Sequence, residues 1–334
     1  MKFFNMTTQI EKIDFNSIER ANKILCDGGI VAIPTETVYG LGAIATNPQA
    51  VMEIFRVKGR PSDNPLIAHV HKDYDICKLV HIRQDYVYDL IKAFTPGPLT
   101  LVFESKGVVC EQATCGGDTL AIRIPSHQGC QQLLKRVDAP IVAPSANLSK
   151  HTSPVTAMHV YNDLNGKIEL ILDGGKCTGG IESTVLDVTG KIPRILRAGL
   201  VTKEMIESVV GRCEIALHKE GDKIKSPGVK YKHYQPNCKT ALFEYGDLQG
   251  VLKAYDEEIK LGGKPFIMCS DEFISKLPNK NLLSLGNTPQ QIACNLYDKL
   301  LEGEKKATLI IAISMKDEKG INMGIMNRLR KSCG

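Results

Sequence analysis

The chain has 334 residues, a length typical of about two domains. Its composition is 43% hydrophobic and 24% charged, which excludes a chain that is disordered or of low complexity throughout. The net charge of +5, from 42 basic and 37 acidic residues, is too small to indicate a nucleic-acid scaffold, but it allows a local basic site for an anionic ligand.

The cysteines and the apolar runs indicate the cellular compartment of the protein. No apolar run approaches the ~18 residues that span a bilayer, and the first residues lack the apolar core of a signal peptide. The eleven cysteines are scattered without a CxxC pair, which is the spacing of neither a disulfide framework nor a zinc site. We therefore expect free thiols in a reducing cytosol and a cytoplasmic protein with no membrane association. Separately, we expect a monomer.

The first two thirds of the chain mix short strands with a few helices and irregular Gly/Pro loops. Asn16 or Ser17 is expected to cap a first helix, and Asn47-Pro48 and Ser153-Pro154 are expected to begin two others. Such a mixture predicts an α/β or α+β domain with a large mixed sheet. The expected strands cover residues 30–33, 65–70, 99–103, 120–124, 140–143, 169–172, 183–187 and 194–197.

The composition changes after this domain. Residues 218–233 hold five lysines against two acids and little that could fill a core, which predicts an exposed linker. Beyond it, strands and helices alternate in the manner of a small, doubly wound, Rossmann-like domain. The expected boundaries are 1–211 for the first, larger domain, 212–237 for a basic linker or lid, and 238–334 for the second domain. The second domain's expected strands cover 240–245, 265–269, 281–285 and 308–313, and its helices 248–260, 289–301 and 321–330.

Several familiar motifs are absent or out of context. Residues 40–45 imitate a dinucleotide-binding fingerprint, but they do not join a strand directly to a helix. The sequence has no GxxxxGK[ST], GxSxG or HExxH motif. His69 and His71 share one face of a strand; a metal pair is one interpretation, and an ordinary polar strand end is favoured.

Other segments suit an anionic ligand. Residues 34–40 place hydroxyls and a carboxylate where a buried strand leaves the sheet, although a capped turn explains them equally well. Arg56 and Lys58 suit the C-terminal dipole of a helix. Arg60, on a loop stiffened by Pro61, suits phosphate recognition instead.

A buried cation and three polar segments complete the set of candidates. Arg123 lies between isoleucines in a strand, so it must form an ion pair or reach a cleft. The Ser/Asn-rich residues 143–149 and 180–184 offer groups to an anion or a base edge, or else serve as caps and turns. Residues 226–236 contain two tyrosines, a histidine and two lysines between prolines. This composition favours a lid that covers a ligand; the alternative is a segment packed between the domains.

In this order, the segments resemble the threonylcarbamoyl-AMP synthase family in its long, two-domain form. The resemblance covers about Ile13 to Lys331 and departs from the family pattern at Lys150-His151, Ala198, Val229 and Lys232. The matching segments are PTETVYGLG (34–42), KGRPSDNPL (58–66), PGPLTLV (96–102), AIRIPSH (121–127), APSANLS (143–149), DGG (173–175), GIESTVLDV (180–188), ILRAG (195–199), SPGVKYKHYQP (226–236) and GIMNRLRK (324–331).

The resemblance implies a fold and a reaction. The fold would be a YrdC-like α/β domain, with a twisted mixed sheet and a large basic cleft, followed by the Rossmann-like domain. The reaction would convert L-threonine, bicarbonate and ATP into L-threonylcarbamoyladenylate and pyrophosphate, the first step of tRNA N6-threonylcarbamoyladenosine modification next to the anticodon. Other proteins of that pathway would then transfer the threonylcarbamoyl group.

The resemblance also assigns roles to residues. Mg²⁺ would accompany ATP without a nameable protein ligand, no organic cofactor is implied, and Lys58 and Arg60 would be catalytic. A linker tyrosine, Tyr234 or Tyr231, would close over the nucleotide. Threonine would bind to Thr37, His69, Arg123, Ala143 and Ser183, and ATP to Arg60, Asn64, Thr119, Ser145, Ser153 and Arg197.

Three alternatives stay open on the sequence alone. The first is a double-stranded RNA-binding module of the same fold, against which the mild net charge argues, with weak RNA binding as a lesser form. The second is a carbamoyl-transfer enzyme of the hydrogenase-maturation type, whose acylphosphatase and zinc-finger segments this chain lacks. The third makes the C-terminal domain purely structural.

Overall fold

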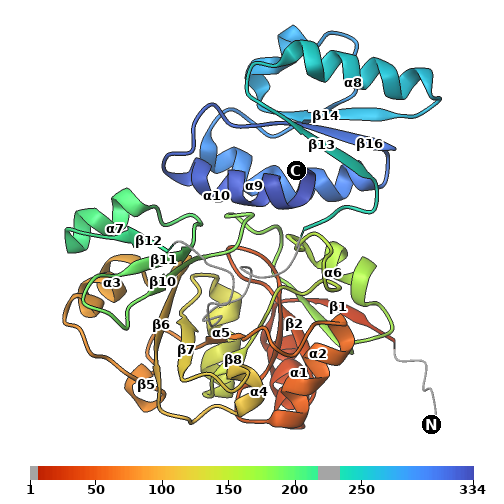
Figure 1. Ribbon diagram of the computed structural model, residues 1–334. Coiled ribbons are helices and arrows are strands. Elements are labelled where there is room, and N and C mark those ends of the chain that lie inside the picture. The colour runs from red at the N-terminus through yellow and green to blue at the C-terminus, as the bar shows by residue number, and fades with distance from the viewer. Residues whose placement is uncertain (1–6, 217–233) are drawn as a thin grey trace.

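The computed structural model describes residues 7–216 and 234–334, and these form a large N-terminal domain and a smaller C-terminal domain stacked upon it (Figure 1). The predicted linker 212–237 lies mostly outside the described residues. Its first part still belongs to the large domain, because Glu214–Ile215 (β12) pairs with β11.

Twelve strands of the described residues form one mixed sheet in the N-terminal domain. Their order is β1-β9-β2-β3-β8-β4-β7-β6-β10-β11-β12, and β5 pairs with β6. The mixture of parallel and antiparallel pairs confirms the predicted mixed sheet. The remaining strands are β1 (Gln9–Lys12), β2 (Val31–Ile33), β3 (Gly40–Ile44), β4 (Ile67–His69), β5 (Val80–His81), β6 (Leu99–Ser105), β7 (Thr119–Arg123), β8 (Ile141–Val142), β9 (Leu170–Asp173), β10 (Thr184–Asp187) and β11 (Arg194–Arg197).

Helices cover both faces of this sheet. On one face, α1 and α5 pack against each other and bury Val31 and Ile33 of β2. On the other face, Ala32 joins the core that contains α2 and α6. The alternation along β2 therefore divides the domain into two apolar layers. The helices are α1 (Phe15–Cys26), α2 (Pro48–Lys58), α3 (Tyr86–Phe94), α4 (Glu111–Thr114), α5 (Gln128–Val137), α6 (Ala157–Leu164) and α7 (Lys203–Val210), with a 3-10 turn, η1 (Ile76–Lys78).

The capping rules worked at one of the three predicted helix starts. Asn47 caps α2 through its side chain, as predicted, and Gly59 ends the helix in the left-handed conformation. The prediction of Asn16 or Ser17 as the cap of α1 was wrong, because Asp14 and Ser17 form a reciprocal capping box there. The third helix, α6, begins at Ala157 behind a Thr156 cap and not at residues 153–154.

The apparent dinucleotide fingerprint is a strand. Gly40–Ile44 is β3, which pairs antiparallel with β2 and β8 in the middle of the sheet. A Cβ at Gly42 would lie 2.9 Å from Ile141 Cγ2, so the glycine permits close packing between strands. The segment is therefore part of the sheet and not a phosphate-binding turn.

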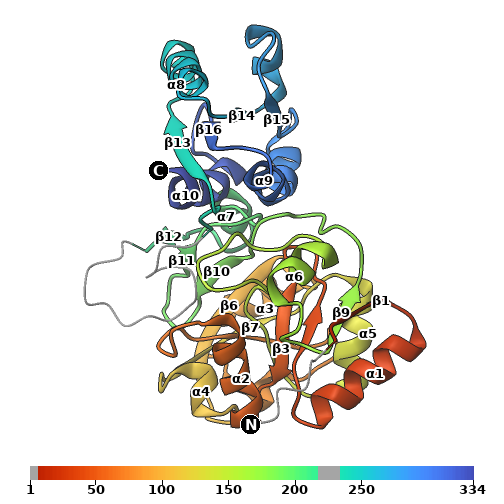
Figure 2. The same ribbon diagram turned by 90° about the vertical axis from the view of Figure 1, so that its right-hand side faces the viewer.

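The C-terminal domain is a four-stranded parallel sheet in the order β13-β16-β14-β15. The helix α8 (Leu248–Lys260) covers one face, while α9 (Pro289–Glu304) and α10 (Ile321–Cys333) cover the other (Figures 1 and 2). This arrangement confirms the predicted doubly wound topology. The strands are β13 (Lys239–Phe243), β14 (Pro265–Cys269), β15 (Leu282–Ser284) and β16 (Leu309–Ile313), and a 3-10 segment, η2 (Asp271–Lys276), follows β14.

The two domains share a continuous apolar core, because α9 and α10 face the N-terminal domain (Figure 1). Gly180, at a φ of +73°, lies against the α9 backbone, where a Cβ would be 2.3 Å from the carbonyl oxygen of Ala293. Gly324 of α10 meets Gly199, and a Cβ there would be 3.2 Å from the Gly199 backbone. Glycines thus allow backbone-to-backbone contact between the domains.

Two expectations drawn from composition can be compared with the structure. All eleven cysteines lie within the described residues and are free thiols, as expected. Among the described helices, none combines the length and apolar character needed to cross a bilayer.

Candidate active site

A single cavity brings together most of the predicted binding residues. The space in this cavity, including the part that is open to solvent, amounts to about 580 Å³. Ten predicted residues line it, from both the threonine set and the ATP set: Thr37, Arg60, His69, Arg123, Ala143, Ser145, Ser153, Ser183, Arg197 and Tyr234. The rest of the lining comprises Val38, Ile67, Pro144, Asn147, His151 and Glu182.

The sheet explains why residues so far apart in the sequence meet here. His69 ends β4 and Arg123 ends β7, and the parallel register places these two residues opposite each other. On the next strand of the sheet, Thr100 of β6 pairs with Arg123, and its hydroxyl lies 2.7 Å from that of Ser183. The end of the sheet where β4 and β7 finish thus forms a wall of the cavity, the usual place for ligands in α/β folds.

One part of the cavity is suited to a carboxylate. Arg123 is 5% exposed, and its Nη1 donates a hydrogen bond of 2.8 Å to the Thr37 hydroxyl. Its Nη2 lies 2.8 Å from Glu36 Oε1, although the two atoms are not aligned for a hydrogen bond. Glu36 therefore balances a buried charge while Arg123 still lines the cavity, so the ion pair and the ligand site are both present.

His69 lies beside this arginine as a neutral ring. Its Nδ1 is 3.0 Å from the Ile67 carbonyl oxygen. Burial, reinforced by the positive charge of Arg123, lowers the pKa of His69 to about 3. His71 has its own partner, Asp138, at 3.1 Å. The two histidine rings therefore have separate partners, a backbone carbonyl for His69 and a carboxylate for His71.

The buried His69 should make the fold sensitive to acid. Its pKa is lowered on folding, so the unfolded chain binds the extra proton and stability falls as the pH drops below 6.5. Between pH 6.5 and 5 the loss should be about 2 kcal/mol. His69→Gln should flatten the dependence of the unfolding free energy on pH in this range, measured by urea denaturation at several pH values. An unchanged slope in the variant would contradict the assignment.

The other part of the cavity carries two more guanidinium groups. Arg60 donates to the carbonyl oxygens of Asn64 and Pro65 at 3.2 and 3.4 Å, while its buried Nε has no partner among the described residues. Burial lowers the pKa of Arg60 to about 10, and the charge of Arg197 contributes to this shift. Arg197 donates to the Ser183 carbonyl oxygen at 3.0 Å, and burial lowers its pKa as well. A bound anion would stabilise both charges.

Three predicted residues lie outside the cavity lining. Lys58 is 3% exposed and donates from Nζ to the carbonyl oxygens of Ser145 and Asn147, which fixes the loop that carries Ser145. Burial lowers its pKa well below the usual range. Asn64 is buried and contributes its carbonyl to Arg60. Thr119 begins β7, about 13 Å along the strand from Arg123. Their roles toward ATP stay predictions.

The linker tyrosines differ in what can be said of them. Tyr231 and the lid segment 217–233 lie outside the described residues. Tyr234 is buried at the cavity wall with a φ of +68°, and its ring stacks on Tyr297 at a centroid distance of 5.3 Å. The Thr152 hydroxyl donates to its carbonyl oxygen at 3.4 Å. Tyr234 therefore contacts both domains, the catalytic domain through Thr152 and the C-terminal domain through Tyr297.

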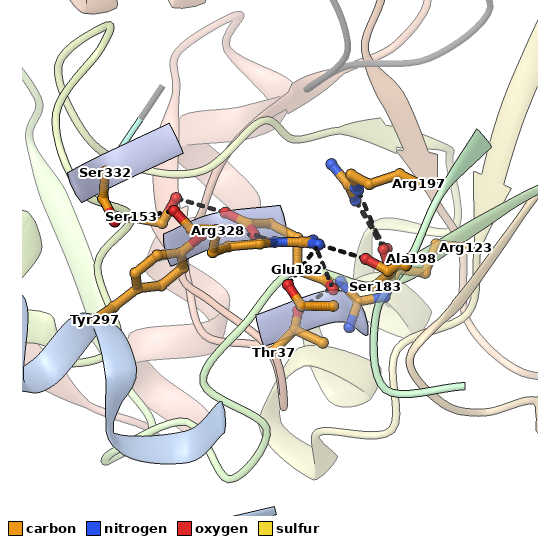
Figure 3. A network of polar contacts seen from close by, with 11 residues as sticks. Thr37, Arg123, Ser153, Glu182, Ser183, Arg197, Ala198, Tyr297, Arg328 and Ser332 are labelled. Carbon is orange, nitrogen blue, oxygen red and sulfur yellow. Dashed lines mark hydrogen bonds and ion pairs between the residues drawn. The ribbon is translucent and has the colours of Figure 1, made fainter. Parts of the chain in front are cut away.

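Sequence reasoning missed a buried polar network behind the cavity. Glu182 accepts hydrogen bonds from Ser153 at 2.7 Å and, across the domain boundary, from Tyr297 of α9 at 2.9 Å. Arg328 of α10 donates to Glu182 Oε2 at 3.1 Å and to the carbonyl oxygen of Ala198 (Figure 3). The network ties the cavity wall to both interface helices of the C-terminal domain. The sequence signal that could have indicated this network is Arg328, an arginine inside the otherwise amphipathic last helix.

Comparison with known proteins supports the interpretation of the whole chain. One family model, Sua5_yciO_yrdC, described as "Telomere recombination", matches residues 23–199. A second, Sua5_C, described as "Threonylcarbamoyl-AMP synthase, C-terminal domain", matches residues 201–334. The threonylcarbamoyl-AMP synthase of Pyrococcus abyssi is 40% identical over 97% of this chain and 96% of its own length. This chain belongs to the threonylcarbamoyl-AMP synthase family.

Other members agree with this assignment in sequence and in structure. The threonylcarbamoyl-AMP synthase of Bacillus subtilis is 39% identical, covering 99% of this chain and 97% of its own. A crystal structure of Sua5 from P. abyssi complexed with L-threonine superimposes with a TM-score of 0.89, at 37% identity and 97% coverage of each chain. The predicted two-domain form of the family, with its YrdC-like mixed sheet, is confirmed.

Proposed function

We propose that this chain joins L-threonine, bicarbonate and ATP into L-threonylcarbamoyladenylate and pyrophosphate, the first step of tRNA N6-threonylcarbamoyladenosine modification. The observation that carries the proposal is the cavity itself, which places Arg123 and Thr37 in the same space as Arg60 and Arg197. Relatives that match nearly the full length carry the corresponding synthase name. The alternative of a double-stranded RNA-binding module is not favoured by these findings.

The cations explain how the protein serves this reaction. Threonine, its carbamate and a triphosphate are all anionic and repel one another in the absence of counter-charges. Arg123, assisted by Thr37, would hold the threonine carboxylate. Arg60 and Arg197 would stabilise the phosphates and the charge that develops at the α-phosphorus. The carbamate oxygen is the attacking group, so the protein needs no nucleophile of its own.

The part of the chain that the structure describes holds no cluster of acidic, histidine or cysteine side chains fit for Mg²⁺. The carboxylate in the cavity lining, Glu182, is already neutralised by Arg328. Mg²⁺ would therefore reach the site on the phosphates of ATP, where it would neutralise part of their charge.

The reaction also defines the partners. The product is a mixed anhydride that must pass to a threonylcarbamoyl-transfer protein acting on tRNA. We infer a cytoplasmic location, where ATP and tRNA are available and the eleven free cysteines stay reduced. We also infer that the chain works as a monomer.

Omission of single substrates tests the proposal. The purified chain should release pyrophosphate from ATP in the presence of threonine and bicarbonate together, and release should fall to background when either is left out. The adduct should appear by mass spectrometry as threonylcarbamoyl-AMP. Pyrophosphate release that does not depend on threonine would overturn the proposed function.

A further inference from the structure

The network behind the cavity fixes the direction of one hydrogen bond. Ser153 is 1% exposed and lines the cavity with part of its surface, while its Oγ lies 2.7 Å from Glu182 Oε1. The other carboxylate oxygen, Oε2, faces the Tyr297 hydroxyl at 2.9 Å and Arg328 Nε at 3.1 Å. Glu182 thus has three neighbours that can each donate a hydrogen bond to it (Figure 3).

The charge state of Glu182 determines which group donates in its hydrogen bond with Ser153. The positive charges of Arg328 and Arg197 lower the pKa of Glu182 to about 2 despite its burial, so the carboxylate is ionised at neutral pH. Burial raises the pKa of Tyr297 well above its usual value, so its hydroxyl keeps its proton. An ionised carboxylate only accepts hydrogen bonds, and the single Ser153 proton must therefore point to Glu182. The Ser153 oxygen then has only lone pairs left for the cavity.

We propose that Ser153 acts as an obligate hydrogen-bond acceptor that recognises a donor group of the nucleotide, and that the C-terminal domain sets this polarity through Glu182. The proposal rests on the proposed function for the identity of the nucleotide. Phosphate oxygens are acceptors and cannot pair with this oxygen. The partner is the amino group of the adenine base or a ribose hydroxyl. Arg328 acts as a positioning residue, since it contacts Glu182 and is not among the residues that line the cavity.

Nucleotide analogues that lack one donor each distinguish the two sources. Purine riboside triphosphate lacks the base amino group, and 2′-deoxy-ATP and 3′-deoxy-ATP each lack one ribose hydroxyl. Affinity for the full-length protein should be measured by calorimetry, and KM by pyrophosphate release. One analogue should bind roughly tenfold more weakly than ATP, as expected for a lost partner of a buried acceptor. In Ser153→Ala that difference should fall to within about twofold.

Variants of the network test the role of the C-terminal domain. Glu182→Asp keeps the charge for Arg328 but withdraws the carboxylate from Ser153, and Glu182→Gln combined with Arg328→Met removes both charges together. Each variant should reduce the discrimination between ATP and the sensitive analogue at least threefold. A threefold reduction is roughly half of the free energy that corresponds to a tenfold discrimination. The kcat at saturating ATP should change less. Tyr297→Phe keeps the ring that stacks on Tyr234 and the remaining contacts of Glu182, so its discrimination should stay near that of the unmodified protein.

Each outcome bears on one part of the idea. Equal binding of all analogues by the unmodified protein, or discrimination that persists in Ser153→Ala, would overturn the assignment of Ser153 as an acceptor. Discrimination that is lost in Ser153→Ala but kept in both Glu182 variants would overturn the role of the C-terminal domain. Calorimetry reports on ATP binding without turnover, so a failure of the proposed reaction would be seen separately from a failure of this inference.

Discussion

Replacing Arg60 with alanine is expected to lower turnover by roughly a hundred- to a thousandfold, while the fold stays intact. Arg60 lines the cavity, and it donates hydrogen bonds to two carbonyl oxygens of its own loop, those of Asn64 and Pro65. Burial disfavours its charge, as the lowered pKa of about 10 shows. The side chain therefore contributes little to stability, and its charge serves a bound anion.

The measurement is pyrophosphate release at saturating threonine and bicarbonate, together with thermal unfolding of the same samples. Arg56→Ala is the matched control, because Arg56 lies one turn away on α2, is 71% exposed and pairs with Glu53 at 2.5 Å. It should keep its activity within about twofold. A loss of less than tenfold in Arg60→Ala, or an equal loss in both variants, would remove Arg60 from the proposed catalytic set.

Replacing Arg328 with methionine should destabilise the protein by about 3–5 kcal/mol, because it leaves the Glu182 carboxylate buried without its main counter-charge. Arg328 is fully buried, and Glu182 is 7% exposed. Arg328 also donates to backbone carbonyls of both domains, those of Ala198 and Gly324. The loss should therefore appear first as separation of the C-terminal domain from the catalytic domain.

Urea denaturation followed by circular dichroism gives the free energy of unfolding. Arg330→Met is the control on the same helix, since Arg330 is 52% exposed and pairs with Glu318 at the surface; it should cost less than about 1 kcal/mol. Glu182→Gln added to Arg328→Met should restore part of the lost stability, because the second change removes the unpaired charge. Similar losses of unfolding free energy in the Arg328 and Arg330 variants would show that the buried ion pair contributes no more to stability than the exposed one.

The regular elements were the easier part to predict from sequence. The helix α8 and the strand β14 were placed with their bounds, since clear periodicity and polar boundaries fix both. Strand β3 was missed because Gly40 and Gly42 weaken the strand pattern, and they are needed for close packing with neighbouring strands. Helices α3, α5 and α7 were also missed.

Site residues could be predicted from the sequence where a single segment carried the signal. Arg123 could be identified because an arginine between isoleucines in a strand needs a partner or a cleft. The sequence could not show that Lys58 contacts backbone carbonyls, since that depends on where a distant loop packs. Glu182, Tyr297 and Arg328 were missed for the same reason: the contacts that define them join residues 115 and 146 positions apart.

The order of synthesis gives the Arg328 contact a further meaning. A nascent chain exposes the segments with Thr37, Arg123 and Ser183 long before α10, which is the last element in chain order. Until α10 has emerged and docked, Glu182 has no cationic partner from the second domain, and the cavity wall behind Ser153 lacks its support. Partly synthesised or C-terminally clipped chains would therefore carry a complete sheet but an unfinished site. Such chains would not be expected to consume ATP.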